Sequence, residues 1–191
     1  MANYVNEVQK LYVAYFSRPA DSAGLAFWTN ALATDLNTGM AQISAAFSSS
    51  SEYQQTYANL DNRAVVEAVY QNLFGRAGEA AGVDFWTNAL DTHAMTIEKV
   101  VADVAAGAQN DDKIVFNGRV AVATLFTSHL DLPYEQQGYT GAAANLKAQA
   151  FIESIVSLQT AAAAIDPGVV DARIAEIVGS PTALDAPHFI G

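Results

Sequence analysis

The protein has 191 residues, of which 51% are hydrophobic, so the chain is long enough to bury a sizeable core. Its 20 acidic and 9 basic residues give a formal net charge of -11, and such a surface repels the phosphate backbone on which nucleic-acid binding depends. The absence of cysteine excludes disulfides, thiolate metal sites and cysteine nucleophiles. We therefore expect a protein that folds without covalent cross-links and does not bind nucleic acid.

The N-terminal segment "MANYVNEVQKLYVAYF" predicts an amphipathic helix and no secretory signal peptide of the usual kind, because no basic stretch precedes an apolar run. Apolar side chains recur at helical spacing at Val8, Leu11, Tyr12, Tyr15 and Phe16. Pro19 disfavours a helical conformation at the residue before it, so we expect this helix to end at Ser17-Arg18.

A second helix is predicted after Asp21, which is a candidate N-cap. Leu25, Trp28 and Leu32 then lie on one face of that helix. Further on, Ser49-x-x-Glu52 has the spacing of a capping box and predicts the start of a short helix.

An internal repeat dominates the first half of the chain: "YFSRPADSAGLAFWTNAL" (15–32) returns 58 residues later as "LFGRAGEAAGVDFWTNAL" (73–90). The aligned pairs include Tyr12 and Tyr70, Phe16 and Phe74, Arg18 and Arg76, Gly24 and Gly82, and Trp28 and Trp86. In the second copy, Gly75 is a candidate left-handed helix cap. After a one-residue shift the third helices also align, with Met40, Ile43 and Phe47 opposite Ile97, Val100 and Val104. We expect the two units to stack and bury their Phe-Trp faces against each other.

The C-terminal part is also predicted to be helical. Residues 115–130 carry apolar side chains at helical spacing, and "DLPYEQQGYTG" (131–141) reads as a loop because of its proline and glycines. Residues 146–164 predict one long alanine-rich helix, and Asp166-Pro167 predicts the start of a last helix that ends near Gly179. No run of alternating β-branched residues is present. The sequence therefore predicts an all-α multi-helix bundle built from two tandem repeat units (1–60 and 61–113) and C-terminal helices (114–191) that complete one compact domain.

The first copy with its flank, "LYVAYFSRPADSAGLAFWTNAL" and then "FSSSSEYQQTY", resembles the DUF4214 repeat. That repeat has the pattern Leu-Tyr-x-x-x-Phe-x-Arg-x-x-Asp-x-x-Gly-x-x-[Tyr/Phe]-Trp-x-x-x-Leu, followed by Ser-x-Glu-Tyr. The second copy departs from it, because Glu79 stands where the first has Asp21 and "AGAQNDDKIVF" replaces the Ser-x-Glu-Tyr segment. The helix over residues 116–130 resembles the segment that commonly follows such repeats.

The resemblance implies a non-enzymatic attachment module. DUF4214 repeats occur in bacterial exoproteins, particularly surface-layer (S-layer) proteins and type I secreted calcium-repeat proteins. N-terminal helical regions of this kind are implied to bind cell-surface polysaccharide, notably the O-antigen of lipopolysaccharide. The resemblance also implies an extracellular location at the cell surface, with export directed by a signal in a C-terminal part, although composition alone favours the cytoplasm. The alternative is a self-association scaffold that binds no glycan.

Three groups of residues are candidates for glycan binding. The first is the aromatic and amide set Tyr134, Gln136, Gln137 and Tyr139. The second is Trp28 and Trp86, whose indole rings could stack on sugars or hold the core of each unit. The third is Arg18 and Arg76, which could hold a glycan or lock each helical hairpin by pairing with Asp21 or Glu79.

No catalytic or cofactor site is predicted. The adjacent acids Asp111 and Asp112 lie near an expected helix start, where carboxylates stabilise a helix, and this favours a structural role over glycosidase chemistry. The three histidines lack the spacing of a zinc site, and phosphate-binding and nucleophile motifs are absent. Aspartate and glutamate oxygens could still bind calcium, although no segment has the pattern of a calcium-binding loop. No stretch is apolar for long enough to predict a membrane span.

Overall fold

The computed structural model describes residues 4–57 and 59–179, which form helices and no strand, so the all-α prediction is confirmed for this part of the chain. None of the helices in it combines the length and apolarity needed to cross a bilayer. The helices are α1 (Val5–Phe16), α2 (Ser22–Thr34), α3 (Leu36–Ser49), α4 (Ser51–Tyr57), α5 (Asn62–Phe74), α6 (Ala80–Asp91), α7 (Ile97–Ala106), α8 (Asn110–Ser128), α9 (Pro133–Gly138), α10 (Gly141–Glu153), α11 (Leu158–Ala164) and α12 (Pro167–Val178).

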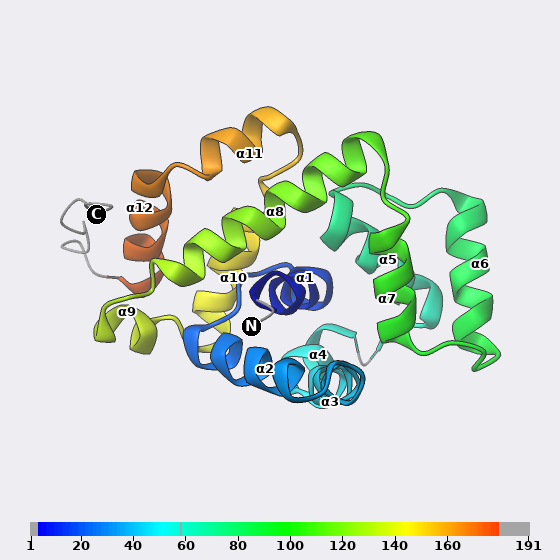
Figure 1. Ribbon diagram of the computed structural model, residues 1–191. Coiled ribbons are helices and arrows are strands. Elements are labelled where there is room, and N and C mark those ends of the chain that lie inside the picture. Colours follow the sequence, from blue (N-terminus) through cyan, green and yellow to red (C-terminus); the bar gives the residue numbers. More distant parts are fainter. Residues whose placement is uncertain (1–3, 58, 180–191) are drawn as a thin grey trace.

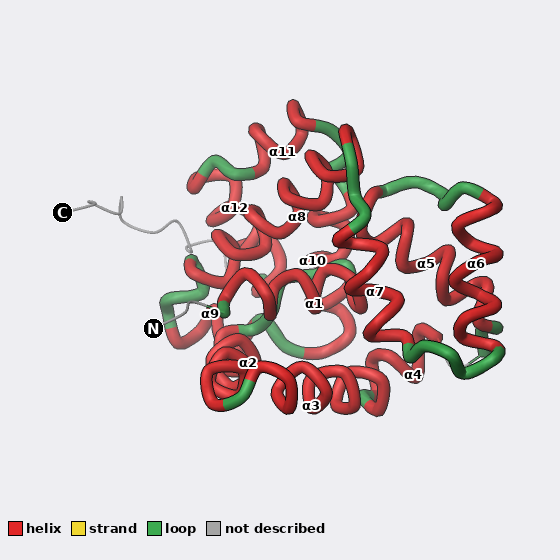
Figure 2. The backbone as a smooth tube through the Cα atoms, turned by 45° about the vertical axis from the view of Figure 1, so that its right-hand side comes forward, coloured by secondary structure: helices red, strands yellow, loops and turns green. Residues whose placement is uncertain are grey.

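Two helices organise the bundle. The first is α1, which lies at the centre, seen end-on in Figure 1, and packs against helices of both repeats and against α8. The second is α8, which runs diagonally across the molecule and contacts α1, α5, α10, α11 and α12. Helices α2 to α4 form one side and α5 to α7 another, while α9 to α12 close the far end (Figures 1 and 2). The buried apolar side chains of all three parts form one continuous core.

The first helix of each repeat ends where the sequence predicts, and in both units the residue after it is left-handed, although this conformation was predicted only for Gly75. Ser17 caps α1 with φ of 51°, and Gly75 caps α5 with φ of 71°. Asp21 is the predicted N-cap of α2, since its carboxylate accepts a hydrogen bond from the Gly24 amide at 2.7 Å. Its counterpart Glu79 makes no side-chain cap bond to α6.

The glycine shared by the two repeats makes room for a buried tyrosine. A Cβ added to Gly24 would lie 2.4 Å from the Tyr12 hydroxyl oxygen, and one added to Gly82 would lie 2.8 Å from that of Tyr70. Both distances are shorter than a van der Waals contact. The motif glycine therefore allows the second helix of each unit to lie directly on the tyrosine of the first.

An arginine locks each repeat, but its partner in the first unit differs from the predicted one. Arg18 binds Glu52 through two hydrogen bonds of 2.7 and 2.6 Å and does not pair with Asp21, whose carboxylate caps α2. Arg76 binds Asp112 in the same bidentate manner at 2.7 and 2.5 Å and also pairs with Glu79 at 2.9 Å, as predicted. Asp112, in the first turn of α8, thus takes the place that Glu52 of α4 has in the first unit.

The expectation that the Phe-Trp faces of the two units bury each other is wrong. Phe27 and Phe85 are 63% and 59% exposed, and the adjacent Trp28 and Trp86 are half-buried against the core. The units meet instead through α1 and α5. There the Asn72 amide donates hydrogen bonds to the Ala14 carbonyl and the Tyr57 hydroxyl, at 3.1 and 3.0 Å.

Two local predictions about helix starts need correction. The predicted capping box at Ser49 is wrong, because Ser49 is the last residue of α3; it is the Ser50 hydroxyl that accepts from the Tyr53 amide at the start of α4. The predicted loop over 131–141 contains the short helix α9, with Pro133 in its first position. The start of the last helix is confirmed, since Asp166 caps α12.

The long helix predicted over 146–164 is divided into α10 and α11. Ser157 caps α11, and Ile155 between the helices is fully buried. The fully buried Arg119 of α8 donates to the carbonyls of Ile155 and Glu153, and also to two carbonyls at the end of α5. Burial lowers the pKa of Arg119 to about 10. This side chain therefore joins the ends of two helices from different parts of the chain.

Candidate functional site

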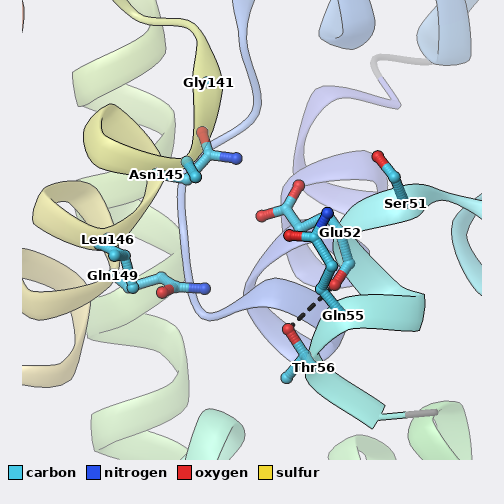
Figure 3. A pocket seen from close by; sticks show the side chains of 9 residues that line it. Ser51, Glu52, Gln55, Thr56, Gly141, Asn145, Leu146 and Gln149 are labelled. Atoms are coloured by element: carbon cyan, nitrogen blue, oxygen red, sulfur yellow. Dashed lines mark hydrogen bonds between the residues drawn. The ribbon is translucent and has the colours of Figure 1, made fainter.

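A polar groove separates the first repeat from the C-terminal helices. It consists of two adjoining cavities of about 440 and 400 Å³, which share Gly141 and Asn145. The larger is lined by Ser51, Glu52, Gln55, Thr56, Gly141, Ala142, Asn145, Leu146 and Gln149 (Figure 3). The smaller is lined by Arg18, Asp21, Ser22, Ala23, Gln136, Tyr139, Thr140, Gly141 and Asn145. The walls thus come from α2 and α4 on one side and from α9 and α10 on the other.

The larger cavity presents amide groups from both walls. Figure 3 shows the amides of Asn145 and Gln149 pointing from α10 toward Glu52 and Gln55 of α4. Within residues 4–57 and 59–179, the side chains of Gln55 and Asn145 make no hydrogen bond. Gln149 donates to the Phe16 carbonyl at 2.9 Å, and its side-chain oxygen remains as an acceptor. The groove therefore holds several donors and acceptors that folding does not use.

Leu146 adds an apolar surface beside these amides. It is 64% exposed and lies one residue after Asn145, on the same helix as Gln149. Small residues precede it, with Gly141 and Ala142 in the first turn of α10 and in the lining of the groove. The larger cavity is consequently open and combines apolar with hydrogen-bonding surface.

The junction of the two cavities is fixed by the ion pair of Arg18 and Glu52. Burial alone would lower the pKa of Arg18, but its hydrogen bonds to Glu52 raise it above its usual range, so the guanidinium stays charged. The pair itself contributes little net charge, and the carboxylate of Asp21 adds negative charge to the smaller cavity. Tyr139 is anchored beside this pair, because its hydroxyl donates to the Pro19 carbonyl at 2.8 Å, and burial raises its pKa.

The structure brings three of the predicted site residues to this groove, namely Arg18, Gln136 and Tyr139. Tyr139 needs a correction, because it is only 2% exposed and offers no ring face for stacking. The Gln136 amide donates to the Leu130 carbonyl at 2.8 Å.

The other candidates lie outside the groove. Trp28 and Trp86 pack against the core, and Arg76 is engaged by Asp112 and Glu79. Tyr134 and Gln137 are exposed on α9 but do not line either cavity.

Sequence reasoning missed the residues that form most of the groove, Gln55, Asn145, Leu146 and Gln149. One signal was present. Asn145 and Gln149 are polar residues four positions apart in an alanine-rich helix, so they share a helix face. Among the described residues, no group of three or more acidic or histidine side chains is arranged to hold a metal ion.

The comparisons with known proteins identify a family and no individual relative. The model of the family described as "Domain of unknown function (DUF4214)" matches residues 2–57 and 44–113, two overlapping segments that together span more than half of the chain. No curated protein and no solved structure matches the chain. The repeat motif, its arginine lock and its tyrosine-glycine contact all lie within the matched segments. The chain therefore belongs to the DUF4214 family.

Proposed function

We propose that this protein is a non-enzymatic attachment module of an exported, S-layer-like bacterial surface protein. In this proposal the groove between α4 and α10 binds cell-surface polysaccharide such as the O-antigen of lipopolysaccharide. The observation that carries the proposal is the set of amides of Gln55, Asn145 and Gln149 beside the exposed Leu146. The proposal places the protein outside the cell, after export of the type I kind.

The chemistry of the groove suits a neutral, hydroxyl-rich ligand. Each amide both donates and accepts, which matches the mixed donor and acceptor character of sugar hydroxyls. The apolar C–H face of a pyranose ring can lie on Leu146. Because Arg18 is neutralised by Glu52 and the chain carries a net charge of -11, an acidic glycan would be held less well than a neutral one.

The shape of the groove favours a chain over a single sugar. Two open cavities of about 440 and 400 Å³ adjoin each other and share the lining residues Gly141 and Asn145. Sites for small molecules are usually single concave pockets that enclose the ligand. A polymer that runs along both cavities uses this open form, since each sugar unit adds contacts while its neighbours extend into solvent.

The second candidate function is a self-association scaffold. The observation that favours it is a set of exposed apolar side chains between the end of α10 and the first turn of α12, at Val156, Leu158, Ile165 and Val169. Exposed apolar patches are common at protein interfaces.

A binding titration separates these functions. The purified protein is titrated with O-polysaccharide released from the lipopolysaccharide of the producing strain, with and without calcium, and heat and tryptophan fluorescence are recorded. We expect saturable binding that is lost in Gln55→Ala/Asn145→Ala and in Ala142→Trp, which fills the groove. Gln159→Ala is the control, because Gln159 is exposed on α11 away from the groove.

Failure of the folded protein to bind would overturn the glycan proposal. Light scattering over a range of protein concentrations then tests the scaffold function. A scaffold requires the measured molar mass to rise with protein concentration, and Leu158→Ser must abolish that rise.

A further inference from the structure

One large apolar side chain of the repeat motif lies outside the buried core. The aligned Tyr12 and Tyr70 are buried, as are Phe16 and Phe74. Phe27 and its repeat equivalent Phe85 are the exception, with 63% and 59% of their surface exposed. The same large apolar residue is thus presented to solvent at the same place in both units.

The two rings make nearly identical contacts with the adjacent tryptophans. Phe27 lies edge-to-face on Trp28 with ring centroids 4.7 Å apart and an interplanar angle of 78°. Phe85 lies on Trp86 at 4.7 Å and 77°. Both tryptophans pack against the core, so each holds its phenylalanine in a fixed orientation. A ring that is already oriented loses little conformational freedom when a ligand stacks on it.

An amide accompanies each ring. Asn30 and Asn88 lie three residues after Phe27 and Phe85, a spacing that makes them neighbours on the helix surface. Both asparagines are exposed, and in the described part of the chain neither side chain makes a hydrogen bond. Each unit therefore offers an apolar ring next to an unused donor and acceptor.

We propose that Phe27 with Asn30 and Phe85 with Asn88 are two equivalent auxiliary contact sites for a neutral polysaccharide. The inference rests on the proposed function and adds to it the contact points outside the groove. At each site the C–H face of a pyranose ring stacks on the phenylalanine, and its hydroxyls bind the asparagine amide.

The placement of the two sites favours a polymer over a protein partner. Helices α2 and α6 lie far apart on the molecule in both views, so their rings do not form one apolar patch (Figures 1 and 2). The exposed neighbours of Phe27 on its own helix are small, such as Ala23 and Ala26, whereas a stable protein interface buries about 800 Å² on each partner. A polysaccharide repeats the same sugar unit along its length and can reach two like sites at once, which increases its apparent affinity.

Side-chain amide signals in nuclear magnetic resonance spectra test each site separately. The ¹⁵N-labelled protein is titrated with the released O-polysaccharide, and the signals of Asn30 and Asn88 are assigned through Asn→Asp variants. We expect them to shift saturably together with those of Gln55 and Asn145. A shift of Gln55 and Asn145 alone overturns this inference and supports the groove. A shift of Asn30 and Asn88 alone overturns the groove and supports this inference. The absence of any shift overturns both.

The affinity of phenylalanine variants supplies the second test. The double variant Phe27→Ala/Phe85→Ala is expected to bind the polysaccharide about tenfold more weakly than the wild type. The double variant Phe27→Tyr/Phe85→Tyr is expected to bind like the wild type, because it keeps both aromatic rings. Leu60→Ala is the control, since it removes an exposed apolar side chain that lies outside the groove and outside both proposed sites. Unchanged affinity in the double alanine variant overturns the inference. Gel filtration gives a second check: if the wild type self-associates and the double alanine variant does not, the two rings make contacts between copies of the protein, and the inference is overturned.

Discussion

The two repeat units hold the same arginine in different settings. In the first unit the side chains of Arg18 and Glu52 are 9% and 21% exposed, and the acid comes from α4, a helix that belongs to the unit. In the second unit Arg76 is 39% exposed and is shared by Asp112 and Glu79. The two units thus share the geometry of the arginine lock but differ in its burial. Because the loss of one partner costs more in a buried ion pair than in an exposed one, the two locks should differ in their contribution to stability.

Alkaline pH should have the largest effect on stability, because burial raises the pKa of three tyrosines, of which Tyr12 and Tyr57 belong to the first unit and Tyr139 lies beside the groove. Burial raises the pKa of Tyr12 and of Tyr57 to about 12. Unfolding exposes these hydroxyls, which then ionise near pH 10, so between pH 10 and 12 the unfolded state binds fewer protons than the native state. Stability therefore falls with rising pH, by about 1.4 kcal/mol per pH unit for each tyrosine.

Arg119 acts in the opposite direction over part of this range. Its pKa is lowered to about 10, so the unfolded state binds the extra proton between pH 10 and 12.5 and stability rises with pH. The three tyrosines with raised pKa, Tyr12, Tyr57 and Tyr139, outweigh one arginine. Urea unfolding at pH 8 and pH 11 measures the net loss, and Tyr57→Phe should make it smaller. An unchanged midpoint at pH 11 would contradict the prediction.

Removal of the arginine should have the next largest effect. Arg18→Met leaves Glu52 without its partner in a partly buried site, and we expect a loss of about 3 kcal/mol in the free energy of unfolding. Arg76→Met is the matched variant, and its exposed setting predicts a loss of about 1 kcal/mol or less. Urea denaturation of both variants measures the difference, and equal losses would show that burial does not distinguish the two locks.

The motif glycines provide a smaller contrast. Gly24→Ala brings a Cβ to 2.4 Å from the Tyr12 hydroxyl and close to Asp21, whereas Gly82→Ala meets only Tyr70, at 2.8 Å. We expect a cost of about 2 kcal/mol for the first and about 1 kcal/mol for the second, as for other overpacked sites. Thermal unfolding is a suitable measurement. A Tyr12→Phe background should reduce the cost at Gly24, because the hydroxyl is the obstacle.

The helix caps should give the smallest effect. Asp21→Ala removes a cap bond and should cost about 1 kcal/mol. Glu79→Asp introduces the first unit's cap residue into the second and should add about 0.5 kcal/mol, reduced by the loss of the exposed contact with Arg76. If chemical denaturation shows that Glu79→Asp destabilises the protein, the contact with Arg76 contributes more than the cap.

The sequence predicted the features of the fold that depend on neighbouring residues. The amphipathic spacing of α1 and α5, the caps at Asp21 and Asp166 and the left-handed Gly75 are all encoded within a few positions. The partner of Arg18 was not predictable in this way, because Glu52 is 34 residues away and Asp21 is the nearer acid. The break between α10 and α11 was missed because no proline or glycine marks it. It arises where Ile155 enters the core and Arg119 binds the carbonyls around it.

The groove was harder to predict than any helix. Its walls come from α4 and α10, about 90 residues apart in the chain, and nothing in either segment identifies the other. Gln55 and Asn145 are ordinary surface amides until the packing of α1 and α8 sets them across a gap. The exposure of Phe27 and Phe85 was missed for a related reason, since an aromatic residue beside tryptophan in an amphipathic helix suggests a core position.

Because Arg76 pairs with Asp112 at the start of α8, the two ends of the repeat array are not equivalent. The first unit ends with its own short helix, so its arginine lock, Arg18 with Glu52, is complete before the junction around residues 59–61. The second unit completes its lock only with the first turn of the helix that also spans the rest of the bundle. A copy inserted ahead of α5 would therefore leave both arginine locks intact, whereas a copy placed after α7 would separate Arg76 from its acid.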